Sequence, residues 1–193
     1  MGKRVQATDH TRDRIRVALI KLLGTQSYGS ITIADVAKAA DVSTRTVQRQ
    51  YGSKDEILCA MIRRPSDLVE AKWRRVATSN SARDAIRSFV TLIFEIYLEQ
   101  DAEAWASFSR SEESPELAET LRNGIEARRT RIRDMVKSRG GELRLGTEEA
   151  AQMLLGFTSY FTWRGLTKYS GYSSPEAAEL VTKLLCQALL DDR

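Results

Sequence analysis

The side chains best suited to bind another molecule are concentrated in residues 44–51, whose sequence is TRTVQRQY. Only Val47 and Tyr51 are apolar in this segment, and they are separated by one helical turn. A helix here packs along one narrow edge and leaves its arginine, glutamine and threonine side chains exposed. Arginine pairs with guanine and glutamine with adenine, and all three residue types bond phosphate. The segment is therefore suited to contact a nucleic acid, although a solvated surface helix has the same pattern.

The charge distribution favours the same part of the chain. The 193 residues carry a net charge of +4. Residues 1–64 hold 12 Lys and Arg against 6 Asp and Glu, whereas residues 65–193 have a net charge of −2. A basic segment joined to a mildly acidic one indicates that only the first part binds a polyanion.

Two further helices are predicted to precede residues 44–51 and to position them. A first helix ends near Gly24, because apolar residues recur at the spacing of one helical face: Ile15, Ala18, Leu19 and Leu22. Thr32 is suited to cap a second helix, whose first turn carries Asp35, and Ser43 is suited to cap the third. Three helices with a tight turn before the last form a helix-turn-helix. An ordinary three-helix bundle with a solvated third helix is the alternative.

Residues 10–64 resemble the DNA-binding domain of the TetR (tetracycline-repressor-like) family of transcriptional regulators. The matching positions are Gly29, Thr32, Ile33, Ala37, Ala40, Val42, Ser43, Thr46, Tyr51, Lys54 and Leu58. The resemblance implies an all-α fold, with a three-helix DNA-binding domain followed by a helical domain for effector binding and dimerisation. Asp41 stands where the family usually has glycine, but aspartate tolerates the left-handed conformation, so we expect the turn to form. Arg45, Gln48 and Gln50 also depart from the family, so a relative's operator is not expected to apply.

By this resemblance, residues 44–51 enter the major groove of DNA. The expected base contacts are Thr44, Arg45, Gln48 and Arg49. The expected phosphate contacts are Thr32, Ser43, Thr46, Gln50, Tyr51 and Lys54. Arg45 and Gln48 are the strongest base-reading candidates, and Lys54 begins the next helix, where backbone N–H groups also favour an anion. Thr32 and Ser43 are needed as helix caps in any case, and Tyr51 also fits the core.

Residues 65–193 are predicted to be helical throughout, because they show no alternating pattern typical of strands. Cap, proline and acidic residues indicate helix starts at the following positions: Ser81, Asp101, Ser114, Thr147 and Ser174. We expect two domains. Residues 1–64 form the DNA-binding domain and begin with a flexible arm over residues 1–10. Residues 65–193 form the helical ligand-binding and dimerisation domain.

The last two predicted helices carry more apolar surface than a terminal hairpin needs. The final helix is expected to place Leu180, Leu184 and Ala188 on its inner side. The family resemblance implies that the helix pair builds a homodimer interface, with candidates Met153, Tyr160, Leu180, Leu184 and Ala188. Aromatic helices can also enclose a small apolar or aromatic effector. The candidates are Phe89, Ile93, Tyr97, Trp105, Phe108, Phe157, Tyr160, Phe161 and Trp163, although such stripes more often form core.

Other function classes are disfavoured. The sequence has no phosphate-loop, nucleophile-elbow or zinc-protease motif, one histidine (His10) and two distant cysteines (Cys59 and Cys186). We therefore expect no enzyme, no catalytic residue, no metal and no cofactor. No apolar run approaches a membrane span and no signal core follows the N-terminus, which predicts a cytoplasmic protein without membrane contact.

The expected partners are a palindromic double-stranded DNA operator, a second copy of the chain and a small-molecule effector that releases a repressor from DNA. A DNA-binding regulator with no effector is the alternative, and a helical enzyme is a remote one.

Overall fold

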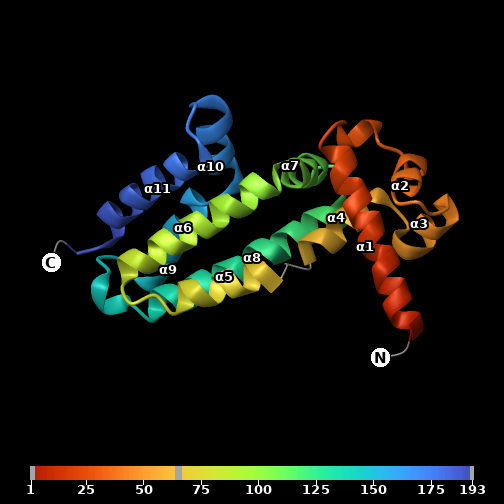
Figure 1. Cartoon of the computed structure of the whole chain (residues 1–193). Coiled ribbons are helices and arrows are strands. Elements are labelled where there is room, and N and C mark those ends of the chain that lie inside the picture. The colour runs from red at the N-terminus through yellow and green to blue at the C-terminus, as the bar shows by residue number, and fades with distance from the viewer. Residues whose placement is uncertain (1–2, 64–66, 192–193) are drawn as a thin grey trace. The chain divides into compact units, whose positions relative to one another are not determined.

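The computed structural model describes residues 3–63 and 67–191, which form eleven α-helices and short turns with no strand (Figure 1). This confirms the predicted all-α fold. The described residues divide into two compact units. The first unit comprises residues 3–63 and 101–124, and the second comprises residues 67–100 and 125–191. The sequence predicts a division at residue 64 alone, whereas α7 and the start of α8 pack with the N-terminal helices.

The first unit is built around the predicted helix-turn-helix. Its elements are α1 (Lys3–Leu23), the short turn η1 (Tyr28–Ser30), α2 (Ile33–Ala39), α3 (Thr44–Tyr51), α4 (Lys54–Arg63), α7 (Asp101–Arg110) and the beginning of α8 (Pro115–Lys137). Helix α1 covers residues 3–10, where the sequence predicts a flexible arm. No glycine or proline interrupts the chain between Lys3 and Leu23, so nothing breaks the helix. Residues 1 and 2 lie outside the described residues.

Side-chain caps set the boundaries of α2 and α3. The Thr32 side chain accepts a hydrogen bond from the Asp35 backbone N–H at 3.1 Å, and the Asp35 carboxylate accepts one from the Thr32 backbone N–H at 2.8 Å. The Ser43 hydroxyl accepts a bond from the Thr46 backbone N–H at 3.1 Å. These bonds satisfy donors that a helix start leaves open, and they confirm the predicted caps. The chain enters α3 at a defined residue, which fixes the face that α3 exposes.

The core of the first unit is shared by all its helices. The side chains of α1 to α4 that it buries include Ile15, Leu19, Val36, Val47, Tyr51, Ile57 and Leu58. Ala106 of α7 and Leu117 of α8 are buried in the same cluster. The apolar edge of α3 predicted from Val47 and Tyr51 is therefore confirmed, and it packs on a core that two later helices complete.

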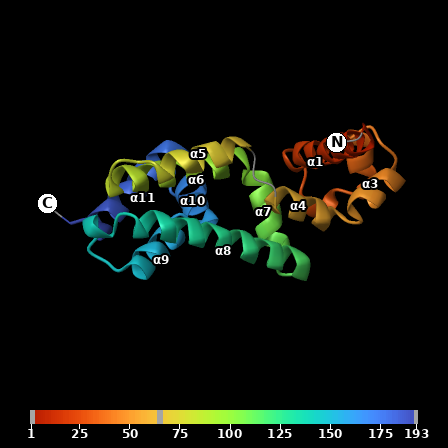
Figure 2. The same cartoon turned by 90° about the horizontal axis from the view of Figure 1, so that it is seen from below.

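The second unit is a helical bundle (Figures 1 and 2). It contains α5 (Asp67–Ala77), α6 (Ala82–Glu99), the end of α8, α9 (Thr147–Phe157), α10 (Tyr160–Arg164), a π-helical turn η3 (Gly165–Tyr169) and α11 (Ser174–Leu189). Helix α6 packs along both α5 and α11. It buries most of its apolar residues, as its broad apolar surface predicts.

Two local features of this unit differ from the sequence expectation. The pattern after Thr147 predicts one helix through Trp163, but α9 ends at Phe157 and a separate helix, α10, begins at Tyr160. The Ser159 hydroxyl accepts a bond from the Thr162 backbone N–H at 3.1 Å and so caps a new helix. The last helix was predicted to start with a cap at Ser174. Instead Ser173 forms the capping box with Glu176, because the acid must lie three residues after the cap.

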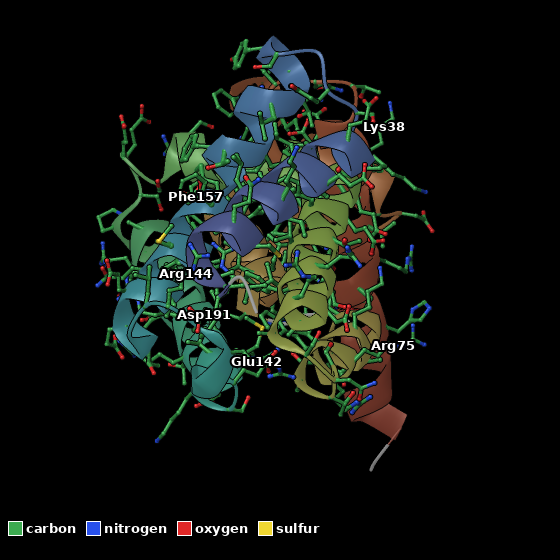
Figure 3. The ribbon with its side chains drawn as sticks, turned by 90° about the vertical axis from the view of Figure 1, so that its left-hand side faces the viewer. Lys38, Arg75, Glu142, Arg144, Phe157 and Asp191 are labelled. Atoms are coloured by element: carbon green, nitrogen blue, oxygen red, sulfur yellow. The ribbon has the colours of Figure 1, made fainter. Side chains whose placement is uncertain are left out.

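The end of α11 is held by the segment that follows α8. Leu143 and Leu190 form a single antiparallel bridge. The Arg144 backbone N–H donates to the Leu189 carbonyl at 2.9 Å, and the Arg144 guanidinium lies 3.8 Å from the Asp191 carboxylate. Arg144, Asp191 and Glu142 appear close together in Figure 3. These contacts set where α11 ends. Among the described residues, no helix is long and apolar enough to cross a membrane.

Candidate nucleic-acid interface

Helix α3 presents its polar residues to solvent. Thr44, Arg45, Gln48 and Arg49 are exposed, while Val47 is buried. Among the residues that the structure describes, the side chains of Arg45, Gln48 and Arg49 have no hydrogen-bond or ion-pair partner. Their donors and acceptors are thus available to another molecule, and Arg and Gln suit the edges of guanine and adenine. The four predicted base-contacting residues lie together on this exposed side of one helix.

The turn before α3 has the conformation expected from the sequence. Asp41 has a φ of 51°, which is the left-handed region that aspartate tolerates. The Arg14 guanidinium of α1 donates to the Ala40 carbonyl at 2.5 Å and to the Asp41 carbonyl at 2.8 Å, and it pairs with the Asp41 carboxylate at 3.1 Å. Arg14 therefore satisfies carbonyls at the end of α2 and ties α1 to the turn.

Replacing Arg14 by alanine is expected to destabilise the protein by about 1–3 kcal/mol, because two carbonyls lose charge-assisted hydrogen bonds. The free energy of unfolding is measured by urea denaturation. Lys21→Ala, at an exposed position on the same helix, is the matched control. Equal midpoints for the two variants would contradict this role of Arg14.

The predicted phosphate-contacting residues have different surroundings. The hydroxyls of Thr32 and Ser43 are both engaged in helix caps. The Thr46 hydroxyl lies 2.9 Å from that of Ser43, and Gln50 is half-buried. The hydrogen bonds from the Thr32 hydroxyl and backbone N–H hold the pKa of Asp35 below its usual range. The caps that the sequence requires at Thr32 and Ser43 are confirmed, and their phosphate contacts stay a prediction.

Lys54 and Tyr51 are engaged with the protein itself. The Lys54 ammonium donates to the Tyr28 carbonyl at 2.8 Å and to the Ile31 carbonyl, and it lies 4.3 Å from the centre of the Tyr28 ring. Burial lowers the pKa of Lys54. The buried Tyr51 hydroxyl donates to the Arg12 carbonyl at 3.2 Å. An ammonium has three N–H donors, so Lys54 retains one for a phosphate while it holds η1 against α4.

Lys54→Ala is expected to weaken binding to specific and random DNA alike and to reduce the dependence of log affinity on log salt by about one unit. The thermal midpoint should also fall, because η1 loses its anchor. Fluorescence anisotropy over a salt series measures the first effect, with Lys183→Ala on α11 as the control. A loss restricted to the specific site would contradict the phosphate assignment.

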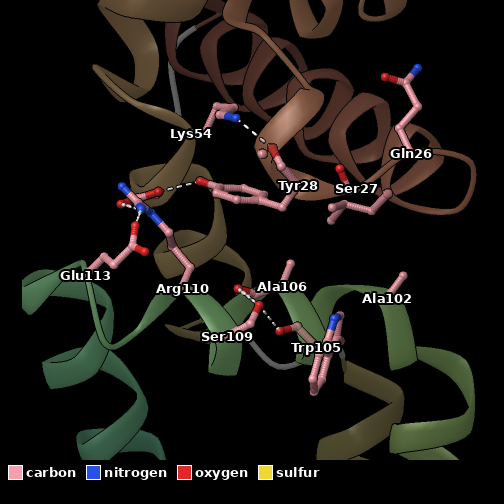
Figure 4. Close-up of a pocket in the computed structure, with 13 residues that line it drawn as sticks. Gln26, Ser27, Tyr28, Lys54, Ala102, Trp105, Ala106, Ser109, Arg110 and Glu113 are labelled. Carbon is pink, nitrogen blue, oxygen red and sulfur yellow. Dashed lines mark hydrogen bonds and ion pairs between the residues drawn. The ribbon is translucent and has the colours of Figure 1, made fainter.

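A cavity of about 520 Å³ lies within the first unit, between η1, α4 and α7 (Figure 4). The Tyr28 hydroxyl donates to the Asp55 carboxylate, which lies 3.5 Å from the Arg110 guanidinium. Burial and the neighbouring Asp55 raise the pKa of Tyr28. Burial would raise the pKa of Asp55, but hydrogen bonds from Tyr28 and Ser114 and the charge of Arg110 lower it below its usual value. The opposite charges of Asp55 and Arg110 thus neutralise each other at the cavity wall.

The predicted effector residues are divided between the two units. Trp105 is 45% exposed and lines the cavity of the first unit, and Phe108 is half-buried in that unit. In the second unit Phe157 and Phe161 are exposed. The others are buried there: Phe89, Ile93, Tyr97, Tyr160 and Trp163. The five buried candidates are therefore the ones that lie together in one unit, and they include an aromatic cluster.

Three rings define that aromatic cluster. The ring centres of Tyr97 and Tyr160 are 5.4 Å apart in an edge-on arrangement, and Trp163 lies within 6.0 Å of both. The Arg128 guanidinium donates to the Tyr97 hydroxyl at 2.5 Å, and that of Arg164 donates to the Tyr160 hydroxyl at 3.1 Å. Sequence reasoning missed Arg128, because it falls in an arginine-rich stretch of α8 that has the pattern of a solvated face.

The predicted dimer residues are divided between the interior and the surface. Tyr160 is buried within its own chain, and Met153 and Leu180 are half-buried. Leu184 is 45% exposed and Ala188 is also exposed, so their expected inner position is wrong. Helix α11 instead buries Val181, Leu185 and Leu189 against its own chain, because α6 packs on that side. The opposite side of α11 is left with apolar residues in solvent.

The sequence of the first unit matches a known family. Residues 15–61 match the family model of bacterial regulatory proteins, tetR family. A comparison with curated protein sequences returns no significant match. The described residues contain no group of three His, Cys, Asp or Glu side chains that could hold a metal ion.

Solved structures resemble the chain over most of its length. SmeT in complex with triclosan superposes with a TM-score of 0.74 at 16% identity, over 95% of this chain and 93% of SmeT. A TetR transcription regulator from Haloarcula marismortui gives 0.73 at 16%, over 95% and 100%. NalD, the secondary repressor of the MexAB-OprM multidrug efflux pump in Pseudomonas aeruginosa, gives 0.71 at 16%, over 96% and 98%.

At these identities the structural comparisons establish the fold, and the match to residues 15–61 establishes the DNA-binding segment. Both agree with the exposed polar face of α3. Residues 15–61 thus match the tetR family of bacterial regulatory proteins, and the chain as a whole shares the fold of solved TetR-family transcriptional regulators.

Proposed function

We propose that the protein is a homodimeric repressor that binds a palindromic DNA operator in the cytoplasm and is released by a small apolar or aromatic effector. The observation that carries this proposal is the exposed face of α3, on which Arg45, Gln48 and Arg49 have no partner within the described chain. Residues 1–64 also carry a net charge of +6, which attracts DNA phosphates to this face. The protein is proposed to act by binding alone, without catalysis.

The homodimer is supported by apolar side chains on the helices near the C-terminus. Phe157 and Phe161 are 42% and 58% exposed, and Leu184 and Ala188 are exposed on α11. Exposed apolar side chains that recur on neighbouring elements are typical of an interface. A two-fold dimer also presents two α3 helices to the two halves of a palindromic site.

The effector is supported by the aromatic cluster of the second unit and by the related structures. Tyr97, Tyr160 and Trp163 offer rings and hydroxyl groups to a small molecule. SmeT was solved with triclosan, and NalD is a repressor. An effector releases DNA only if it binds the DNA-free conformation more tightly than the DNA-bound one.

The proposal is tested by selecting DNA from a random library with the purified full-length protein. Sequencing should recover a palindromic site, which the protein binds as a dimer with a salt-dependent affinity. A thermal-shift screen with apolar and aromatic compounds then identifies effectors, and each one should lower the affinity for the selected site. Recovery of a single unrepeated motif would contradict the dimer, and a screen without any stabilising compound would favour a regulator that has no effector.

A further inference from the structure

Arg128 differs from its arginine neighbours on α8. Three of those neighbours reach a carboxylate: Arg129 pairs with Glu126 at 2.6 Å, Arg131 with Glu70 at 2.8 Å and Arg133 with Glu148 at 2.6 Å. Arg128 has no carboxylate partner among the residues that the structure describes. Its positive charge is therefore not neutralised by the described part of the chain, although its guanidinium is partly buried.

The Arg128 guanidinium is hydrogen-bonded to Tyr97 through one of the guanidinium nitrogens. Nη1 of Arg128 donates to the Tyr97 hydroxyl at 2.5 Å, and its Cζ lies 6.0 Å from the centre of the Tyr97 ring. Nε of Arg128 is buried and has no acceptor among the described residues, which is also true of Nε of Arg129 and Arg164. No bond from Nη2 is present within the described residues. The edge formed by Nε and Nη2, which binds a carboxylate through two parallel hydrogen bonds, is thus unused.

Tyr97 connects Arg128 to the aromatic cluster and to a second guanidinium. Tyr97 packs against Tyr160 and Trp163, and both tyrosines are buried. Arg164 donates to the Tyr160 hydroxyl at 3.1 Å, and its Cζ lies 6.0 Å from the Tyr160 ring. Each of the two paired tyrosine rings thus has a guanidinium at its hydroxyl. This combination suits a ligand with an apolar body and a negatively charged end.

A buried guanidinium nitrogen without an acceptor is costly, and an uncompensated charge in a protein interior is more so. A carboxylate removes both costs, because it brings one negative charge and two acceptor oxygens in the geometry of the fork. A neutral amide brings one acceptor and no charge.

We infer that the effector is an amphipathic carboxylate, whose carboxyl group binds the Nε/Nη2 edge of Arg128 while its apolar part packs against Tyr97, Tyr160 and Trp163. Tyr97 acts as a positioning residue that orients the guanidinium. This inference rests on the proposed function, since it assigns the effector to the second unit and names its chemical class.

The test compares decanoate and phenylbutyrate, each beside its primary amide, on the full-length protein. Isothermal titration calorimetry should show that each carboxylate binds about 10- to 100-fold more tightly than its amide, as expected for hydrogen bonds between charged groups. Arg128→Gln should remove that preference and leave amide affinity unchanged. Arg122→Gln, at an exposed position on the same helix, is the matched control and should bind like the unaltered protein.

Further measurements keep the inference falsifiable. Circular dichroism checks that Arg128→Gln is folded. If it is not, Tyr97→Phe replaces it, and a loss of carboxylate affinity with unchanged amide affinity is then expected. Equal affinities for acid and amide would overturn the inference while leaving an apolar effector in place. Absence of carboxylate binding by the unaltered protein would overturn it as well. A failure to select any operator would instead overturn the proposed function, and calorimetry would still decide whether Arg128 binds a carboxylate.

Discussion

Replacing Arg45 by alanine is expected to lower the affinity for the selected operator by about 5- to 150-fold, equivalent to about 1–3 kcal/mol, with little change for random DNA. The exposed guanidinium has no partner within the described chain, so its removal leaves the protein intact and deletes only contacts with DNA. The loss should be largest at one base pair of each half-site, because an arginine reads a single guanine. Fluorescence anisotropy with the operator and with single-base variants at constant salt measures this effect.

Arg75→Ala is the control for the loss of one positive charge. Arg75 is exposed in the second unit, so its replacement should leave operator affinity unchanged. If Arg45→Ala weakens operator and random DNA equally, Arg45 contacts phosphate rather than a base. The base-reading face would then have to be reassigned to Gln48 and Arg49.

Introducing a carboxylate into the proposed dimer interface should lower operator affinity more than Arg45→Ala does. We expect Leu184→Glu to convert the dimer into a monomer and to lower operator affinity by a factor on the order of 100 or more, since a carboxylate in an apolar interface is unpaired and desolvated. A monomer also engages only one half-site, so the contribution of the second α3 is lost. Analytical ultracentrifugation measures the mass, and anisotropy measures the affinity.

Leu98→Glu separates this effect from a general response to added charge. Leu98 is 58% exposed on α6 and lies outside the helices proposed for the interface, so its replacement should preserve the dimer. A dimeric Leu184→Glu variant with unchanged operator affinity would place the interface elsewhere. The exposed Phe157 and Phe161 would then need another explanation.

Helix α3 was predictable because the signals that define it are local. Val47 and Tyr51 define a narrow apolar edge, and Thr32 and Ser43 set where α2 and α3 begin. Caps and helical periodicity depend on residues within about one turn, so the sequence contains all the information needed. The left-handed conformation of Asp41 was predictable for the same reason. These positions all lie within residues 15–61, the segment that matches the family model.

Contacts between distant residues were not predictable. Lys54 has the position of a phosphate contact, but its ammonium is held by the carbonyls of Tyr28 and Ile31, more than twenty residues away. The capping serine of α11 is Ser173 rather than Ser174, whose hydroxyl donates to the Phe94 carbonyl and accepts from Trp163. Two adjacent serines are equivalent in a local pattern, and packing against α6 and α10 distinguishes them.

The sequence by itself determined the all-α fold, the helix-turn-helix and the four exposed polar residues of α3, because short-range periodicity and capping specify them. Only the tertiary structure decided that α7 belongs with the DNA-binding helices and that Leu184 faces solvent. It also distinguished Arg128 from the arginines beside it. Arg129 pairs with Glu126 one turn earlier on α8, whereas Arg131 and Arg133 reach Glu70 and Glu148 on other segments. Arg128 donates to the Tyr97 hydroxyl instead, and only the tertiary structure brings that tyrosine to it.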